Sequence, residues 1–426
     1  MMTRNGGLLC DEMGLGKTIQ MVGLLKNGSH ACKASLLVAP VAVLEQWASV
    51  AKKSGIDVAR PAAGGLRWDR NGSAGETGLY MIGYEMAARH PRLLAAYAWD
   101  YAIWDEAHRL ASGNKATEIA ASVKATAKWL LTGTPIVNKI KDMRILLSVI
   151  GIQVVDSLEA MAPILKERIL ARTMDQLRES MPDAPPKPVY HTTMLEFATE
   201  DEAEFYRCMT GAIQKRWRAI EADGNALEKL KLFMRLRQLS LHPQVYIAGR
   251  KKALGALYKR DDWVGSSSKF DAIKALIGEG GRWIIFCHFH TEMDMLKELL
   301  QPVVAKVQIY SGALNAAEKE AVLAGTQSGA ASEVLLVQLQ SGGVGLNLQH
   351  FNKILFTGPW WTKALMDQAV GRAVRIGQSD VVQVYNVVLK EEGALNIDTY
   401  MTQKAQEKGE LCAKVLAAAS NIVGPL

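Results

Sequence analysis

A glycine-rich stretch near the start of the chain has the residue types of a phosphate-binding loop. Its five consecutive residues are Gly14, Leu15, Gly16, Lys17 and Thr18. Glycine lets backbone N–H groups close around phosphate, lysine reaches the β- and γ-phosphates, and a threonine hydroxyl can ligate Mg²⁺. A helix beginning there would add the positive end of its dipole. The strict GxxxxGK[ST] pattern would have glycine where Asp11 stands, so an ordinary glycine-rich turn is the alternative.

A pair of carboxylates follows further along the chain, in the sequence YAIWDEAH at 101–108. An apolar run leads directly into Asp105 and Glu106, as at the C-terminal end of a buried strand. A carboxylate in that position can hold Mg²⁺, while its neighbour polarises the attacking water. We assign Asp105 to the metal and Glu106 to the water. Alone, the pair could be a solvated acidic turn; after a phosphate-binding loop, triphosphate hydrolysis is the better interpretation.

Two arginines in the second half of the chain, Arg372 and Arg375 within DQAVGRAVRIGQ (367–378), could complete such a site. Residues three apart lie on one face of a helix. In phosphoryl transfer, such arginines stabilise the charge that develops on the γ-phosphate, an effect worth ~10³–10⁵ in rate. ATP would then lie in a cleft between two lobes, and closure would assemble the site. The alternative is a solvated helix with surface arginines.

The elements that must position these residues alternate between short apolar strands and helix-length segments in residues 1–138, and again in 266–390. Apolar strands separated by helices indicate a parallel sheet covered on both faces. Residues 139–265 are charged, rich in methionine and mostly helical in pattern. The predicted fold class is therefore α/β, with two parallel-sheet lobes joined by a helical segment and a C-terminal helix in 391–426.

Composition limits the class of protein. The chain has 426 residues, too many for one ordinary core, with 49% apolar and 22% charged residues. No apolar run reaches the ~18–20 residues of a membrane-spanning helix, and the first residues lack a signal-peptide pattern. Five scattered cysteines indicate free thiols in a reducing compartment. We therefore expect a soluble intracellular protein with no membrane partner.

The net charge of +7 is compatible with nucleic-acid binding but does not establish it. Lysine and arginine are dense between Arg207 and Arg260, where acidic residues are few. These cations either extend a nucleic-acid track or form the solvated face of helices.

With the three groups in this order, the chain resembles the SNF2 family of superfamily 2 DNA translocases over nearly its whole length. The tail at 396–411 looks like the helix that braces the two lobes of that family. The family also lacks the early glycine, so Asp11 fits its pattern. The stretches that look like family motifs are DEMGLGKTIQ (11–20), LLVAPVAVLEQW (36–47), WDEAH (104–108), LLTGTPIVN (130–138), LRQLSLHP (236–243), YSGAL (310–314), QSGGVGLNL (340–348) and QAVGRAVRIGQ (368–378).

The resemblance implies two RecA-like lobes and an enzyme that uses ATP and Mg²⁺ to move along double-stranded DNA without separating the strands. It implies further nucleotide contacts at Gly345 and Gln368, and a DNA-facing position for IGYEMA (82–87). Trp361 would lie against a DNA groove, unless it is a core aromatic residue. The implied contacts to DNA, which are independent of its sequence, come from Pro40, Thr134, Ser311, Gly312, Ser341, Gly342 and Trp361.

The chain is most similar in pattern to the Rad5/Rad16-like branch of the family. That branch often carries a zinc-binding RING after its HP dipeptide, whereas the linker after Pro243 contains no cysteine or histidine. We therefore expect no zinc. Where the family usually has paired arginines and a nearby lysine, this chain has Ala171, Arg172 and Met174; Lys319 replaces an arginine. These departures bear on DNA grip and coupling rather than on ATP hydrolysis.

Only seven residues precede LLCDEMGLGKTIQ, so the family segment that reads adenine is expected to be missing. Either the chain begins at an internal methionine, or adenine is held by stacking elsewhere. Three alternatives to a translocase stay open: a strand-separating helicase, an ATPase associated with RNA polymerase, and a weakly active scaffold that binds nucleic acid. The bare core is compatible with a bacterial, phage or viral source, and DNA-bound protein complexes are the expected targets.

Overall fold

A computed structural model describes residues 6–27, 34–62, 64, 67–69, 78–95, 97–181, 184–221, 225–327, 329, 331–339, 346–390 and 396–419. The chain divides into two compact units. The first comprises Met1–Ala184, Thr362–Asp367 and Gln406–Leu426. The second comprises Pro185–Trp361 and Gln368–Ala405. Among the described helices, none is long and apolar enough to cross a membrane.

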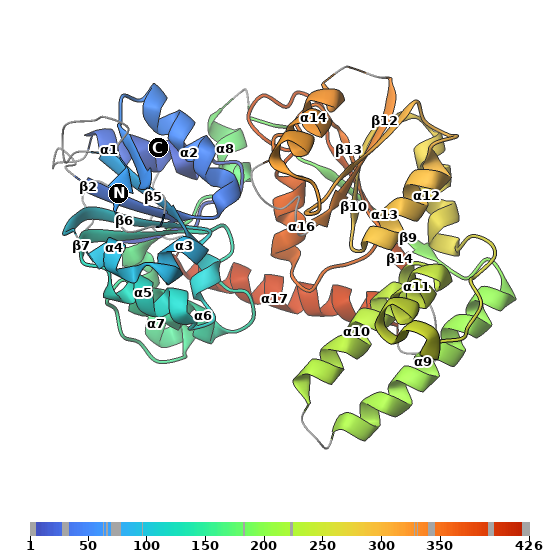
Figure 1. The fold of residues 1–426 in the computed structure, drawn as a ribbon. Coiled ribbons are helices and arrows are strands. Elements are labelled where there is room, and N and C mark those ends of the chain that lie inside the picture. Colours follow the sequence, from blue (N-terminus) through green and yellow to red (C-terminus); the bar gives the residue numbers. More distant parts are fainter. Residues whose placement is uncertain are drawn as a thin grey trace. The chain divides into compact units, whose positions relative to one another are not determined.

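The first unit is built on a sheet with the strand order β4-β3-β5-β2-β6-β7-β1-β8 (Figure 1). All of its strand pairs are parallel except β3 with β4. The strands are β1 (Gly6–Leu9), β2 (Ala34–Ala39), β3 (Val58–Pro61), β4 (Trp68–Asp69), β5 (Gly78–Gly83), β6 (Trp99–Asp105), β7 (Ala125–Leu131) and β8 (Ile169–Leu170).

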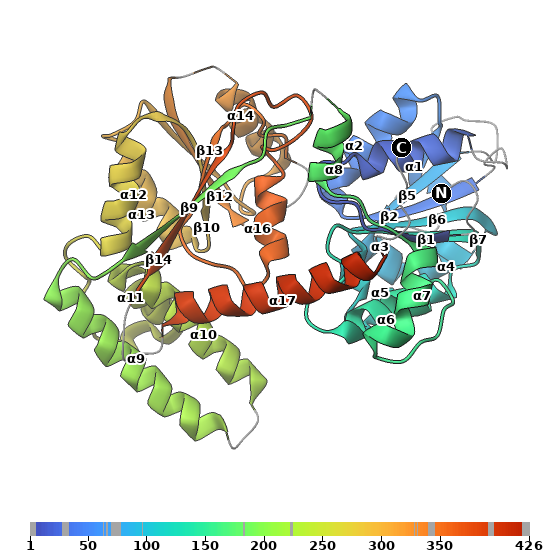
Figure 2. The same cartoon turned by 180° about the vertical axis from the view of Figure 1, so that it is seen from behind.

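Helices cover both faces of this sheet, with α1 and α2 on one side and α5, α6 and α7 on the other (Figures 1 and 2). Every residue of β2 is buried, and Leu36 and Val38 enter the core that includes Leu146 of α6. Such two-sided burial is what a continuous apolar strand predicts. The helices are α1 (Lys17–Asn27), α2 (Val41–Lys53), α3 (Tyr84–Arg89), α4 (Pro91–Ala95), η1 (Ala107–Leu110), α5 (Lys115–Ser122), α6 (Ile140–Val149), α7 (Leu158–Arg168) and α8 (Met174–Ser180).

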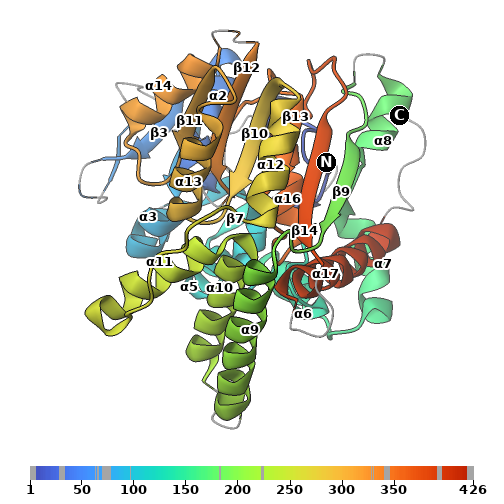
Figure 3. The ribbon, with the colours of Figure 1, turned by 90° about the vertical axis from the view of Figure 1, so that its right-hand side faces the viewer.

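The second unit contains an entirely parallel sheet in the order β11-β12-β10-β13-β14-β9, with α12 and α13 packed on one face (Figure 3). The predicted α/β class with two parallel-sheet lobes is therefore confirmed. The strands are β9 (Val189–Leu195), β10 (Gly281–Cys287), β11 (Lys306–Tyr310), β12 (Ser332–Gln338), β13 (Lys353–Phe356) and β14 (Gln383–Leu389). The helices of this unit are α9 (Glu200–Glu221), α10 (Ala226–Leu241), α11 (Pro243–Leu254), η2 (Gly255–Leu257), α12 (Ser268–Gly278), α13 (His290–Leu300) and α14 (Ala316–Thr326). Two more helices, α16 (Lys363–Val370) and α17 (Ile397–Ala419), have residues in both units.

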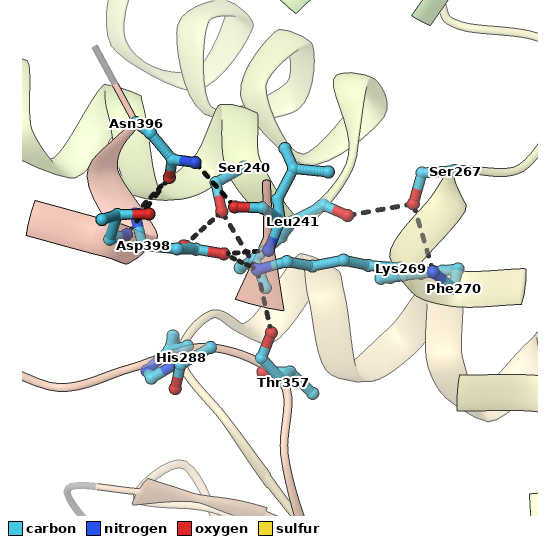
Figure 4. Close-up of polar contacts among 12 residues, drawn as sticks. Ser240, Leu241, Ser267, Lys269, Phe270, His288, Thr357, Asn396 and Asp398 are labelled. Carbon is cyan, nitrogen blue, oxygen red and sulfur yellow. Dashed lines mark hydrogen bonds and ion pairs between the residues drawn. The ribbon is translucent and has the colours of Figure 1, made fainter. Parts of the chain in front are cut away.

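A buried ion pair joins several elements of the second unit (Figure 4). The Lys269 side chain on α12 is 1% exposed, and its Nζ lies 2.5 Å from Asp398 Oδ2 at the start of α17. Lys269 also donates to Ser240 Oγ on α10 at 3.0 Å and to the carbonyl oxygen of Thr357 at 3.2 Å. Since each partner comes from a different part of the sequence, one lysine holds α10, α12, α17 and the end of β13 together.

Candidate nucleotide site

The predicted catalytic residues of the first unit lie at one edge of its sheet. Asp105, Leu131 and Leu9 occupy one row across β6, β7 and β1, because Leu131 is in register with both of the others. Carboxyl ends of parallel strands share one sheet edge, and ligands bind at such edges in open α/β folds. The segments that follow these strands are 10–16, 106–108 and 132–134, so the sheet brings together the phosphate loop, the carboxylate pair and the TGT sequence.

The phosphate loop turns into α1 at Lys17, as its sequence predicts. Gly14 has φ +88° and Gly16 φ +71°, a region of backbone conformation that favours glycine. Lys17 Nζ donates to the carbonyl oxygens of Asp11 at 2.7 Å and Glu12 at 3.3 Å. A Cβ on Gly133 would lie 3.8 Å from this Nζ, so the TGT sequence approaches the lysine. The ammonium group therefore lies inside the loop, where phosphate oxygens could replace the two carbonyls.

Asp11 anchors the loop to the chain that leaves β8. Its carboxylate is fully buried and accepts hydrogen bonds from the backbone N–H of Arg172 at 3.0 Å and from the Arg172 guanidinium at 2.5 Å. The Gln20 amide donates to Asp11 at 2.9 Å and accepts from Arg172 at 2.5 Å. Glu12 accepts from the backbone N–H of Met174 at 2.6 Å. The first half of the loop and residues 172–174 thus form one hydrogen-bonded unit.

Asp105 has the environment of a ligand for a hard cation. Its Oδ2 accepts the indole N–H of Trp47 at 2.8 Å, and its Oδ1 accepts the backbone N–H of Glu106 at 2.9 Å. Burial, and then the charge of Glu106, raise the pKa of Asp105 to about 6, against the opposing effects of Trp47 and Lys17. A carboxylate and the Thr18 hydroxyl, both oxygen donors, are ligands that Mg²⁺ prefers. The donor set therefore fits Mg²⁺.

Among the residues that the structure describes, Glu106 is the one non-glycine residue with a positive φ, at φ 52° and ψ 47°. This left-handed conformation ends β6 abruptly and starts η1. His108 Nδ1 lies 3.3 Å from Glu106 Oε2 and 3.5 Å from Thr132 Oγ1. Non-glycine residues in this conformation cluster at functional sites. The carboxylate predicted to orient water is thus linked through a histidine to the end of β7.

A cavity of about 270 Å³ adjoins this edge within the first unit, lined in part by Glu12, Thr134 and Asp367. Burial raises the pKa of Asp367 to about 6, opposed by Lys363. Cys10 and Cys412 also line the cavity, and burial raises the pKa of both thiols. Raised thiol pKa values make these cysteines poor nucleophiles.

Two family models match the chain in the order that the motifs predict. The SNF2-related domain matches residues 1–161, and the helicase conserved C-terminal domain matches residues 268–377. The chain belongs to the SNF2 family of helicase-like ATPases.

Relatives of this SNF2-family chain come from viruses, bacteria and eukaryotes. It is 25% identical to a probable global transactivator of Orgyia pseudotsugata multicapsid polyhedrosis virus, over 96% of this chain and 87% of that protein. It is 26% identical to an uncharacterized ATP-dependent helicase of Mycoplasma genitalium (96% and 40%). A Mus musculus SWI/SNF-related matrix-associated actin-dependent regulator of chromatin, subfamily A member 1, is 25% identical (90% and 39%). The chain spans about two fifths of the length of the last two.

Among solved structures, the Sulfolobus solfataricus SWI2/SNF2 ATPase core in complex with dsDNA is similar to this chain. The sequence identity is 21% and the TM-score is 0.39, over 98% of this chain and 93% of that one.

The arginines predicted for this SNF2-family ATPase belong to the second unit. The prediction that Arg372 and Arg375 share a helical face is wrong, because α16 ends at Val370. Turns with i→i−3 hydrogen bonds follow, from Arg372 N to Ala369 O and from Gln378 N to Arg375 O. Glycine at 371 disfavours continuation of the helix. Arg372 is 5% exposed, and burial lowers the pKa of Arg375. Gln368, the predicted nucleotide contact, is buried on α16.

The predicted DNA contacts occupy varied positions. In the first unit, Pro40 is buried at the N-cap of α2. In the second unit, Ser311 is buried after β11, whereas Gly312 is exposed and donates its N–H to Gln338. Trp361 packs edge-on against Phe233, with ring centroids 5.1 Å apart. Ser341 and Gly342, together with the predicted nucleotide contact Gly345, lie outside the described residues.

Three side chains around the site were not assigned a role from the sequence: Trp47, Arg172 and His108. Trp47 is the last residue of the LLVAPVAVLEQW motif and lies on the buried face of α2. Its indole N–H is a donor that could have been expected to seek a buried acceptor. Arg172 could have been sought as the cation that a buried Asp11 requires. His108 belongs to the WDEAH motif and stands only two positions after Glu106, so the sequence already indicated that the two side chains could be close.

Proposed function

We propose that this chain hydrolyses ATP with Mg²⁺ and uses the cycle to move along double-stranded DNA, displacing or remodelling proteins bound there. One observation carries the proposal. The row formed by Leu9, Leu131 and Asp105 brings the phosphate loop and the carboxylate pair to one sheet edge. Membership of the SNF2 family supports the same reaction. The proposal includes the predicted division of the chain into a first lobe, a helical segment, a second lobe and a C-terminal helix, with boundaries after residues 138, 265 and 390.

In the proposed reaction, Lys17 exchanges the carbonyl oxygens of Asp11 and Glu12 for phosphate oxygens. Thr18 and Asp105 would hold Mg²⁺, which when bound neutralises charge on the β- and γ-phosphates. Glu106 orients the attacking water, and the neighbouring His108 helps to fix the direction of its carboxylate. The backbone N–H groups of residues 14–18 surround the phosphates.

Residues of the second unit complete the proposal. Arg372 and Arg375 would stabilise charge on the γ-phosphate, and Gln368 and Gly345 would contact the nucleotide. DNA would be held through its phosphates, independently of sequence, because most of the proposed contacts, apart from Pro40 and Trp361, are made by small polar side chains or loop backbone. The proposed DNA-contacting residues are Pro40, Thr134, Ser311, Gly312, Ser341, Gly342 and Trp361.

Hydrolysis is tested by measuring ATP turnover with and without double-stranded DNA for Lys17→Ala and Glu106→Gln. Each change should lower DNA-stimulated turnover by about 10²–10³-fold, because the first removes the cation at the phosphates and the second removes the group that orients the attacking water. Lys26→Ala, on the same helix, and Glu118→Gln, on α5, are matched exposed controls that should retain turnover. A wild-type chain without turnover would favour the nucleic-acid-binding scaffold.

Movement is tested separately, by displacement of a triplex-forming strand and by unwinding of a forked duplex. A double-strand translocase displaces the third strand in an ATP-dependent manner and leaves the fork paired. Fork unwinding without triplex displacement would favour a strand-separating helicase. Turnover that responds to RNA polymerase instead of to DNA would favour the polymerase-associated alternative.

A further inference from the structure

The indole of Trp47 holds the carboxylate of Asp105. Trp47 lies on α2, is 0% exposed, and donates its indole N–H to Asp105 Oδ2 at 2.8 Å. This contact joins residues 58 positions apart, and it fixes one of the two carboxylate oxygens. Glu106 N–H fixes the other oxygen at 2.9 Å. The rotamer of Asp105 is therefore set by the residue that directly follows it in the chain and by a side chain of helix α2.

Indole N–H groups are not routinely paired in this sheet. Within the described residues, those of Trp104 and Trp129 have no hydrogen-bond partner, although both rings are buried. A buried donor without a partner carries a free-energy cost, yet the fold accommodates Trp104 and Trp129 without an acceptor. The hydrogen bond from Trp47 is a specific feature of α2 rather than a consequence of burial.

The position of α2 connects this hydrogen bond with the predicted DNA contacts. The helix begins directly after Pro40, a residue proposed to contact DNA, and Trp47 lies about 10 Å further along at 1.5 Å per residue. The start of α3 lies against the start of α2, since a Cβ on Gly83 would lie 2.8 Å from Val41 Cγ2. From α3, the Tyr84 hydroxyl donates to the carbonyl oxygen of Asp105 at 2.8 Å. Both helices with predicted DNA-facing residues thus contact Asp105.

We propose that Trp47 is a positioning residue through which helix α2, when it meets DNA, sets the orientation of the Asp105 carboxylate for Mg²⁺. The inference rests on the proposed function and extends it to the path by which DNA stimulates hydrolysis. A rigid helix carries a displacement at its N-terminus to Trp47, and the directional N–H···O contact passes it to the carboxylate. Trp47 itself touches neither ATP nor metal.

The experiment compares Trp47→Phe with Trp129→Phe in the full chain. Both changes remove a buried indole from the first unit, Trp47 on α2 and Trp129 on β7, but only the first removes a paired N–H. Binding of a fluorescent ATP analogue is measured without Mg²⁺ and across a Mg²⁺ titration. We expect Trp47→Phe to require about tenfold more Mg²⁺ for tight binding, as for loss of other groups that orient a metal ligand, with metal-free binding unchanged. Trp129→Phe should match the wild type.

A second readout is the ratio of ATP turnover with DNA to turnover without DNA. Trp47→Phe should lower this ratio several-fold, beyond any change in turnover without DNA. Equal behaviour of the two variants would overturn the inference, and so would an equal loss of binding with and without Mg²⁺, because that pattern indicates a structural role. A wild-type chain that binds no MgATP would overturn the proposed function as well, whereas an active wild type with an unaffected Trp47→Phe variant would overturn this inference alone.

Discussion

Asp11 stands at the point of the phosphate loop where a strict P-loop pattern has glycine. Its buried carboxylate accepts hydrogen bonds from the backbone N–H of Arg172, the Arg172 guanidinium and the Gln20 amide. A buried carboxylate is tolerated when its hydrogen bonds and charge are matched, and it is costly when its partner is removed. The loop conformation therefore depends on an arginine 161 residues away in the sequence.

Replacing Arg172 by alanine should lower the free energy of unfolding of the first unit by about 2–3 kcal/mol. The value is below that for a fully buried pair because the Arg172 side chain is 25% exposed. ATP binding should weaken at the same time, since Asp11 no longer holds the loop. The measurements are urea unfolding followed by tryptophan fluorescence and titration with a fluorescent ATP analogue.

Arg178→Ala is the control for Arg172→Ala. Arg178 pairs with Asp175 on α8 at 2.6 Å, where Asp175 is largely exposed, and such a pair contributes about 0.3–0.5 kcal/mol. Equal effects of the two alanine variants would contradict the anchoring role of Asp11. The double variant Asp11→Asn/Arg172→Gln should be more stable than Arg172→Ala, because it leaves no buried charge unpaired.

For single residues, the sequence predicts the functional residues that stand directly after apolar runs, and it misses those that act from another strand or helix. Lys17 and Asp105 could be expected at one sheet edge, because each follows a segment that must be a buried strand. Trp47 and Arg172 could not be paired with their partners, because those contacts depend on which strands are neighbours. Nothing local in the sequence states that β1 lies between β7 and β8.

Among the secondary-structure elements, β9 and α16 differ most from what the sequence pattern suggests. β9 lies inside the segment expected to be mostly helical, yet Val189–Leu195 pairs with Gln383–Leu389 of β14 over seven positions. Its β-branched residues and alternating partial burial are a strand signal, but its partner is remote. α16 is shorter than predicted because the chain turns after Val370. Alternation identifies strands, whereas their pairing and the ends of helices depend on tertiary contacts.

The Lys269–Asp398 pair makes a prediction about how elements of the second unit hold together. Lys269→Ala should lower the free energy of unfolding by about 3–5 kcal/mol, because Asp398 would keep a buried charge without its cation (Figure 4). Lys274→Ala, an exposed lysine on the same helix α12, is the matched control and should have little effect. Chemical unfolding followed by circular dichroism gives both values.

The double variant Lys269→Met/Asp398→Leu should recover much of this loss, since well-packed apolar residues can replace a buried ion pair at little cost. If Lys269→Ala were as stable as Lys274→Ala, the pair would not be a junction between α10, α12 and α17. A double variant no more stable than the single one would indicate that Ser240 and the carbonyl of Thr357, left without the ammonium, dominate the cost.

For the molecule as a whole, the net charge of +7 is small beside that of DNA, so binding depends on where cations gather. The C-terminal half of α9 exposes Lys215, Arg216 and Arg218. Glu228 approaches Arg216 at 3.8 Å and pairs with Lys231 at 2.7 Å, which reduces the net charge of those two cations. Lys215 and Arg218 are consequently the residues through which this helix would add to a track along DNA phosphates.

The double variant Lys215→Ala/Arg218→Ala should weaken binding to double-stranded DNA equally for unrelated sequences. It should also reduce the slope of log Kobs against log salt concentration by about 2, because each lost phosphate contact releases about 0.9 fewer counterions. Fluorescence anisotropy of two labelled duplexes across a salt series measures both effects. Lys52→Ala/Lys53→Ala, which removes two exposed lysines at the end of α2, is the charge-matched control and should leave the slope unchanged. Equal slopes in both double variants would mean that the basic face of α9 is solvated and that DNA is held by the sheet-edge loops alone.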